Sequence, residues 1–142
     1  MGGVQERECV KLNCIKMGKN IRGCARTGNL VVDLSFEFAL GVIEYCRRLE
    51  GDKKYVIANQ LLRSGTSIGA NIREAQNAES GRDFLHKMKL AAKELEETEF
   101  WFLLCEHSEG FPDCVHYYEP ISALRRVINS IIGTTSKSLI RG

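Results

Sequence analysis

The chain has only two prolines among its 142 residues, Pro112 and Pro120. Proline breaks helix interiors, so this scarcity leaves room for long helices before residue 112. No run approaches about 18 consecutive apolar residues, which excludes an ordinary transmembrane helix. The N-terminus also lacks the continuous apolar segment of a secretory signal. The sequence therefore predicts a cytoplasmic protein with no membrane partner.

An excess of one charge is missing as well, since the formal net charge is only +2. Residues 1–32 carry six Lys/Arg against two Asp/Glu, whereas the rest of the chain carries 14 against 16. The protein is therefore not basic overall. Any binding to nucleic acid must depend on where its cations gather and not on their total number.

Metal-binding and catalytic patterns are absent. The spacing of Cys9, Cys14 and Cys24 matches no common zinc pattern, so the six cysteines are interpreted as buried or incidental thiols. No Ser-His-Asp arrangement, phosphate-binding loop or pair of facing carboxylates is recognisable. The sequence thus predicts no catalytic residue, no metal, no cofactor and no enzymatic activity.

Two Asp-x-x-His pairs, Asp83/His86 and Asp113/His116, invite a di-metal interpretation. The first pair opens one predicted helix and the second precedes the next helix. In an antiparallel bundle these positions lie roughly 40 Å apart, from the ~1.5 Å rise per residue. A shared metal is therefore excluded if the bundle is correct, and the histidines are interpreted as solvated.

Four amphipathic segments dominate the rest of the sequence. Apolar residues recur at helical spacing from about residue 34 to Gly51, from 53 to 79, from 81 to 107, and again after Pro112. Short turns between four such helices predict an all-α, antiparallel up-and-down four-helix bundle over residues 30–138. Residues 1–29 are interpreted as a flexible leader and 139–142 as a short tail.

Several residues are candidates for capping these helices. Asp33 or Ser35 is placed to cap the first, and Asp52 to cap the second. Ser80, followed by Asp83 at the third position, resembles a capping box at the start of the third helix.

The second predicted helix contains the most distinctive stretch, in which small residues interrupt the helix signal between Ser64 and Asn71. Gly65 and Gly69 would each cost an isolated helix roughly 1 kcal/mol relative to alanine, so we expect a close backbone contact there. A polar stripe follows the same helix. Its members are Gln60, Arg63, Ser67, Asn71 and Glu74. We interpret the stripe as a polar interface between helices or subunits; a solvated face or a ligand site are the alternatives.

Basic residues form two predicted clusters, one at each end of the bundle. The first surrounds the turn between helices one and two and contains Arg47, Arg48, Lys53 and Lys54. The second contains Arg73, Arg82, Lys87, Lys89, Lys137 and Arg141. Repeated in a symmetric ring, either cluster would contact several phosphates, so these residues are candidate nucleic-acid ligands.

The acidic residues of the third helix have a simpler interpretation. Glu94, Glu96, Glu97 and Glu99 are interpreted as a solvated face, partly balanced by a Lys93/Glu97 pair. Trp101 and the two phenylalanines beside it are expected to pack in the core or at an interface.

Several stretches together resemble one bacterial family. They are Gln60-Leu-Leu-Arg-Ser-Gly-Thr-Ser-Ile-Gly-Ala-Asn-Ile-Arg-Glu-Ala75, Ser35-Phe36-Glu37-Phe38-Ala39, Asp83-Phe84, Ala91-x-x-Glu94-x-x-Glu97-Thr98-x-x-Trp101 and Ser130-Ile131-Ile132-x-Thr134-Thr135. The family comprises small four-helix-bundle proteins encoded within intervening sequences of 23S ribosomal RNA genes. The resemblance covers about residues 30–138.

This resemblance implies a bundle that assembles as a ring, typically a homopentamer. The family is in turn similar to the accessory protein of diversity-generating retroelements, a pentameric barrel that binds nucleic acid and works with a reverse transcriptase. RNA or DNA binding is therefore the first expectation, and a structural or protein-binding module is the alternative. Gly133 stands where many members have lysine, which removes one cation.

Overall fold

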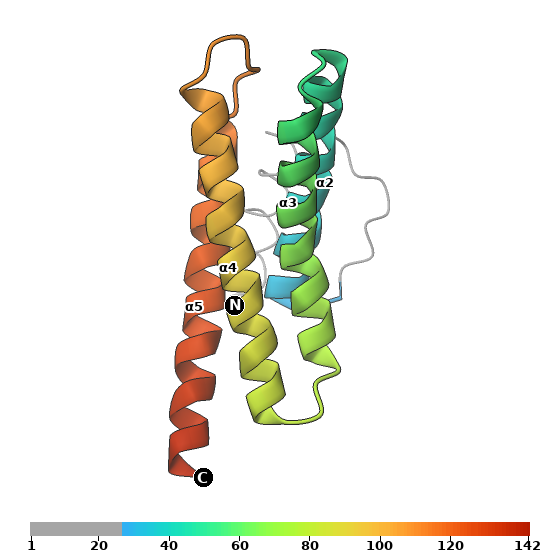
Figure 1. Cartoon of the computed structure of the whole chain (residues 1–142). Coiled ribbons are helices and arrows are strands. Elements are labelled where there is room, and N and C mark those ends of the chain that lie inside the picture. The colour runs from blue at the N-terminus through green and yellow to red at the C-terminus, as the bar shows by residue number, and fades with distance from the viewer. Residues whose placement is uncertain (1–26) are drawn as a thin grey trace.

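The computed structural model describes residues 27–142, which form a bundle of four long helices joined by short turns (Figure 1). The helices are α2 (Leu30–Gly51), α3 (Tyr55–Gln76), α4 (Gly81–Glu106) and α5 (Tyr118–Arg141), and a 3-10 turn, η1 (Val115–Tyr117), leads into α5. Successive helices run in opposite directions, and no strand occurs in this part of the chain. The predicted all-helical class is confirmed.

Each helix packs mainly against the next in sequence, and α2 meets α5 over a shorter stretch than the other neighbours. Tyr117 bridges that junction. Its ring stacks on Phe102 and lies edge-on to Tyr45, and its hydroxyl donates to the Gly41 carbonyl at 2.9 Å. The buried hydroxyl of Tyr45 donates to the Pro112 carbonyl at 2.8 Å. Aromatic rings therefore close the end of the core near the α4–α5 connection.

The start of α2 differs from the sequence prediction. The helix begins at Leu30 with Asn29 at its N-cap position, so neither Asp33 nor Ser35 caps it. Asp33 lies in the first turn, where its carboxylate accepts hydrogen bonds from the amide and hydroxyl of Thr27 at 3.0 and 2.8 Å. The Asp33 carboxylate therefore holds the residues that precede α2 and does not cap the amides of the helix.

The turn between α2 and α3 also corrects a predicted cap. Asp52 follows the end of α2, and α3 begins only at Tyr55, with Lys54 at the N-cap position and no side-chain cap. Lys53 adopts a positive φ of 59°, which lets the chain reverse direction over three residues. The second helix is consequently shorter at both ends than the predicted range of 53–79.

The start of α4 agrees with its prediction more closely. The Ser80 hydroxyl accepts from the Asp83 amide at 3.1 Å, as a capping box requires. The Asp83 carboxylate reaches back to the Glu79 amide at 3.1 Å, one residue before the usual position. In α5, Pro120 lies in the first turn, and the helix continues through Arg141, so most of the predicted tail is helical. Residues 1–26 of the predicted leader lie outside the described residues.

Three cysteines, Cys46, Cys105 and Cys114, are buried free thiols. Burial raises the pKa of Cys46 to about 12 and that of Cys114 to about 11. Cys9, Cys14 and Cys24 precede the part of the chain that the structure describes. Within residues 27–142, no group of three or more His, Cys, Asp or Glu side chains could hold a metal ion. None of the helices there is long and apolar enough to cross a membrane.

Candidate functional site

The two glycines of the α3 motif, Gly65 and Gly69, lie against α2. A Cβ atom added at Gly65 would lie 2.8 and 2.9 Å from the two Cγ atoms of Val42, closer than side chains normally approach. A Cβ at Gly69 would meet only ordinary contacts, the nearest being the Ser35 hydroxyl at 3.5 Å. The two glycines therefore differ: Gly65 lies at a contact between two helices of one chain, whereas Gly69 has space beside it.

That space is a shallow groove of about 120 Å³ between α2 and α3. The Arg73 guanidinium lies 5.8 Å from the centre of the Phe36 ring. The groove is lined by Ser35, Phe36, Ala39, Thr66, Gly69, Ala70 and Arg73. Its lining combines small side chains with an arginine that lies over an aromatic ring.

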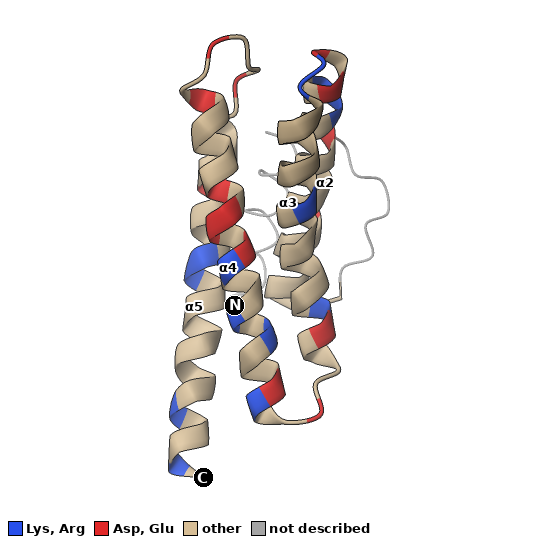
Figure 2. Ribbon diagram, viewed as in Figure 1, with Lys and Arg blue, Asp and Glu red and all other residues tan. Residues whose placement is uncertain are grey.

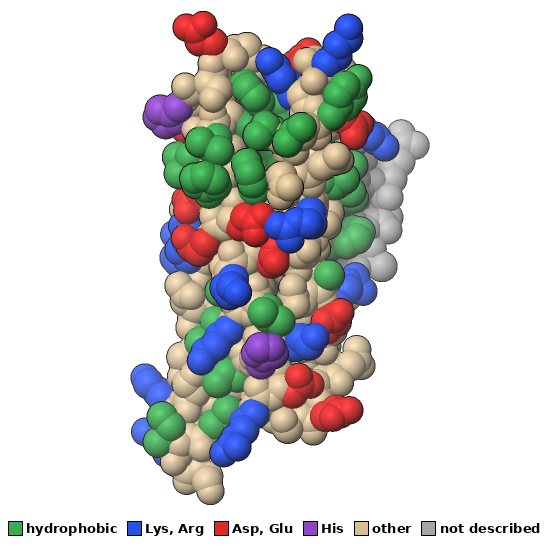
Figure 3. Space-filling view, viewed as in Figure 1, with side chains coloured by type: hydrophobic (Ala, Val, Ile, Leu, Met, Phe, Trp, Pro, Cys, Tyr) green, Lys and Arg blue, Asp and Glu red, His purple; other side chains and the backbone are tan. Residues whose placement is uncertain are grey.

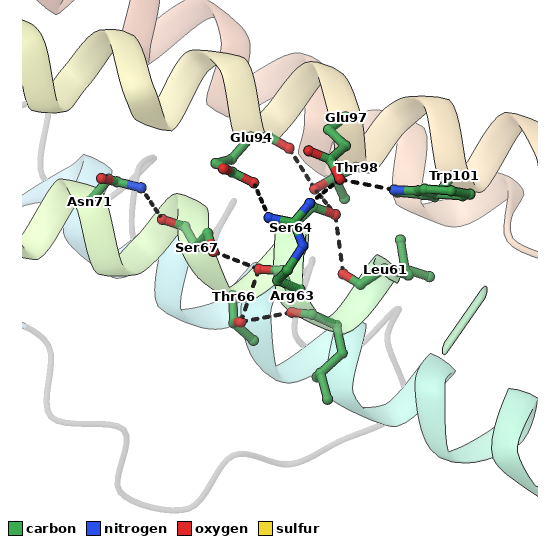
Figure 4. Close-up of polar contacts among 11 residues, drawn as sticks. Leu61, Arg63, Ser64, Thr66, Ser67, Asn71, Glu94, Glu97, Thr98 and Trp101 are labelled. Atoms are coloured by element: carbon green, nitrogen blue, oxygen red, sulfur yellow. Dashed lines mark hydrogen bonds and ion pairs between the residues drawn. The ribbon is translucent and has the colours of Figure 1, made fainter. Parts of the chain in front are cut away.

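The polar stripe of α3 faces α4 (Figure 4). Arg63 bonds to the Glu97 carboxylate and lies 3.8 Å from that of Glu94. Near the other end of α3, the Glu74 carboxylate accepts from Lys87 at 2.8 Å. Asn71 donates to the Ser67 carbonyl at 2.9 Å and so remains within its own helix. The charged members of the stripe thus pair within one chain, and Gln60 is half-buried on the same helix.

A buried hydroxyl pair lies beneath this stripe. Thr98 of α4 and Ser64 of α3 are fully buried, and their hydroxyl oxygens are 3.0 Å apart. Each is also satisfied within its own helix, Ser64 by the Leu61 carbonyl and Thr98 by the Glu94 carbonyl. Neither residue belongs to the polar stripe predicted from the sequence. Ser64 is nevertheless spaced one helical turn from Leu61 and Ile68 on the buried face of α3.

The four glutamates between residues 94 and 99 of α4 are partly exposed, but they pair with arginines of both neighbouring helices and do not form the predicted unpaired solvated face. Glu94 and Glu97 pair with Arg63 of α3, whereas Glu96 and Glu99 pair with Arg125 of α5. The hydrogen bond from Arg63 is the main cause that lowers the pKa of Glu97. We call this set of four glutamates and two arginines the arginine belt. Because Glu97 is engaged by Arg63 and Trp101, the predicted Lys93/Glu97 pair is wrong.

The basic cluster near the α2–α3 turn lies as the sequence suggested, at one end of the bundle (Figure 2). Arg47 lies 3.8 Å from Glu44 in the preceding turn of α2. The ammonium group of Lys54 lies over the Phe111 ring, 4.9 Å from its centre. Arg48 and Lys53 are exposed and form no ion pair within residues 27–142.

The second basic cluster is divided between several faces. Lys87 is engaged by Glu74, which raises the Lys87 pKa through a hydrogen bond, and Arg73 covers Phe36. Arg82 and Lys89 lie exposed on α4, and Lys137 is exposed on α5. The structure therefore does not bring the predicted residues into one compact site.

An exposed apolar patch lies at the opposite end of the α3–α4 face from the cations of α4 (Figure 3). Phe100 is 53% exposed, and Val56 at the start of α3 is 74% exposed. We define the apolar patch by its five members, Tyr55, Val56, Phe100, Leu103 and Leu104. An exposed apolar surface beyond scattered single residues is typical of an interaction site.

Four antiparallel helices with a motif of small residues at a helix contact define the class of small helical-bundle proteins. The sequence model of the 23S rRNA-intervening sequence protein family matches residues 28–131. The chain belongs to that family.

A solved relative supports the same fold. It is a protein of unknown function of the S23 ribosomal protein family from Bacteroides thetaiotaomicron, with 40% sequence identity and a TM-score of 0.67. The match covers 72% of this chain and 97% of the relative. No curated protein is found to match the sequence.

Proposed function

We propose that this protein is a non-enzymatic bundle of the bacterial cytoplasm that self-associates, as a ring of five subunits, and binds RNA or DNA through basic surfaces repeated around the ring. The observation that carries the proposal is the division of the α3–α4 face. One end of this face presents the apolar patch, and the other end presents exposed cations.

The apolar patch supports self-association. Phe100 and Leu104 are four residues apart on α4, and Tyr55 and Val56 open the neighbouring helix. Covering these side chains would remove apolar surface from water, at roughly 25 cal/mol per Å². The number of five subunits is what the family resemblance implies, and residues 60–75 are the longest of the stretches that carry that resemblance. A closed ring would bury the patch of every subunit equivalently.

Repetition supports binding to nucleic acid. A single subunit has a formal net charge of only +2. A ring multiplies each basic surface by the number of subunits, and each added phosphate contact strengthens binding at low salt. Phosphate contact needs neither a cofactor nor a catalytic residue.

Light scattering tests the assembly. A pentamer would have a mass of about 80 kDa, from the subunit mass of 16.0 kDa. Phe100→Asp, which places a charge in the apolar patch, should lower the mass, whereas Ser122→Asp on the exposed surface of α5 should leave it unchanged. A wild-type protein that is monomeric at all concentrations would contradict the ring.

Retention of RNA fragments tests the binding. We expect retention at low salt that weakens steeply as salt rises. The alternative function is a structural module that docks a protein partner, such as a reverse transcriptase, on the apolar patch. Absence of RNA and DNA retention at low salt, together with a monomeric wild type, would favour that alternative because the patch would then be free for another protein.

A further inference from the structure

The first half of α4 carries a line of basic side chains. The two basic clusters predicted from the sequence, one at each end of the bundle, do not include this line as a unit. Its members, which we call the α4 basic line, are Arg82, His86, Lys89 and Lys93. Steps of four, three and four residues keep side chains on one face of a helix. The line is about 16 Å long, from the rise of a helix. All four side chains are exposed.

Carboxylates do not neutralise this line. Its members form no ion pair within residues 27–142. The nearby Asp83 carboxylate is bonded to the Glu79 amide, and Glu74 is bonded to Lys87 beside the line. The remaining acidic residues of α4 begin only at Glu94, where the arginine belt engages them.

Helix stability does not account for the line. Arg82 lies in the first turn of α4, where the helix dipole disfavours a positive charge. Lys93 has a glutamate four residues later, but that carboxylate is bonded to Arg63. Three cations and a histidine that form no ion pair within residues 27–142 are free to contact an anionic ligand.

We infer that the α4 basic line is the surface that binds nucleic acid, and that its ligand is the phosphate backbone of a duplex. This inference rests on the proposed function and deepens it. Among residues 82–93, the only phenyl, phenol or indole ring is that of Phe84, which is half-buried and packed against the core. Single strands are bound through exposed rings that stack on their bases, and the line offers only the small imidazole of His86 for such stacking.

Contacts to phosphates alone carry no sequence information. The α4 basic line should therefore bind duplexes of unrelated sequence with similar affinity, for both RNA and DNA. For a duplex, a plot of the logarithm of the binding constant against the logarithm of the salt concentration has a slope of about −0.9 per contacted phosphate. Each cation of the line that contacts a phosphate therefore changes this slope by a measurable amount.

Fluorescence anisotropy with duplexes of about two helical turns provides the test. The full chain is titrated with two unrelated duplex sequences and with their separated strands, over a series of salt concentrations. Lys89→Glu/Lys93→Glu should weaken binding to every duplex at least tenfold. It should also make the salt slope less negative by about 1.8, the value for two phosphate contacts. The matched control is Arg48→Glu/Lys53→Glu, which reverses two exposed cations at the α2–α3 turn and should bind as the wild type does.

A gain-of-function variant avoids effects of unfolding. His86→Lys adds a permanent cation within the line and should steepen the salt slope by about 0.9. Asn59→Lys adds the same charge on the exposed surface of α3, near its start, and should leave the slope unchanged.

The outcomes separate the two levels of the proposal. A wild type that binds no nucleic acid at low salt overturns the proposed binding function and the inference with it. Binding that survives Lys89→Glu/Lys93→Glu but is lost in Arg48→Glu/Lys53→Glu overturns only the choice of surface. Tighter binding to the separated strands than to the duplexes overturns only the choice of ligand.

Discussion

Replacement of Gly65 by alanine tests the contact between α2 and α3 directly. The new Cβ would lie 2.8 and 2.9 Å from the Cγ atoms of Val42. Val42 is fully buried, and a valine in a helix strongly prefers one rotamer, so its methyl groups cannot turn away. The two helices must separate slightly to accommodate one methyl group.

The magnitude follows from a matched comparison. Overpacking of a well-packed core costs about 1–3 kcal/mol. Alanine also gains ~1 kcal/mol over glycine in a helix interior, which offsets part of that cost. Gly69→Ala has the same helical gain, and its nearest new contact is 3.5 Å away. The Gly65→Ala variant should therefore be less stable than Gly69→Ala by about 1–3 kcal/mol.

Urea unfolding followed by circular dichroism, at one fixed protein concentration, measures this difference. A second variant, Val42→Ala, removes the atoms that the new methyl group would meet. In that background the cost of Gly65→Ala should largely disappear, which a double-mutant cycle would detect as coupling. Equal stability of Gly65→Ala and Gly69→Ala would refute the proposed contact.

Three further predictions concern local stability. Ser80→Ala removes the cap of α4 and should lower the free energy of unfolding by about 1 kcal/mol in the same urea assay, whereas Ser122→Ala should change it little. Thr98→Val keeps the side-chain shape but loses the contact with Ser64, and we expect a loss of about 1 kcal/mol by thermal unfolding. Burial raises the pKa of Cys46 to about 12, so the folded chain retains a proton that the unfolded chain releases near pH 9. Stability should therefore fall as pH rises from about 9 towards 12, and Cys46→Ala should reduce that slope; an unchanged slope would contradict the role of this thiol.

The bundle itself could be predicted from apolar periodicity. Ala58, Leu61, Ile68 and Ile72 recur at helical spacing, and all four are buried in the structure. Such a pattern fixes which face of a helix is turned inward, because the periodicity of side chains is a local property. The short, glycine- and serine-containing turns then left an antiparallel path as the simplest connection.

The errors arose where the neighbouring helix decides the partner. Glu97 could pair with Lys93 on its own helix, but Arg63 of α3 lies within reach and displaces that pair. Nothing in the sequence around Glu97 specifies which residue of α3 lies opposite. The prediction that Asp33 caps α2 is wrong because its carboxylate accepts a hydrogen bond from Thr27, which precedes the helix.

The candidate binding residues were grouped by the ends of the bundle, and that grouping did not show which of them share one face of α4. Lys87 and Lys89 are two residues apart and so point in different directions on α4. Lys87 turns to Glu74, whereas Lys89 is exposed beside His86 and Lys93. The helical spacing of these last residues was already present in the sequence and could have revealed their common face.

The arginine belt has a consequence for how the helices can slide. Arg63 and Arg125 reach α4 from opposite sides, and their four glutamates all lie within residues 94–99. Exposed ion pairs of this kind contribute little to stability. They nevertheless favour one register of the bundle, because a slip of one turn, about 5.4 Å, would leave each arginine beside at most one of its two carboxylates. The ion pairs hold α3 and α5 against the same short segment of α4. Neither helix can shift along α4 without breaking one or more of these pairs.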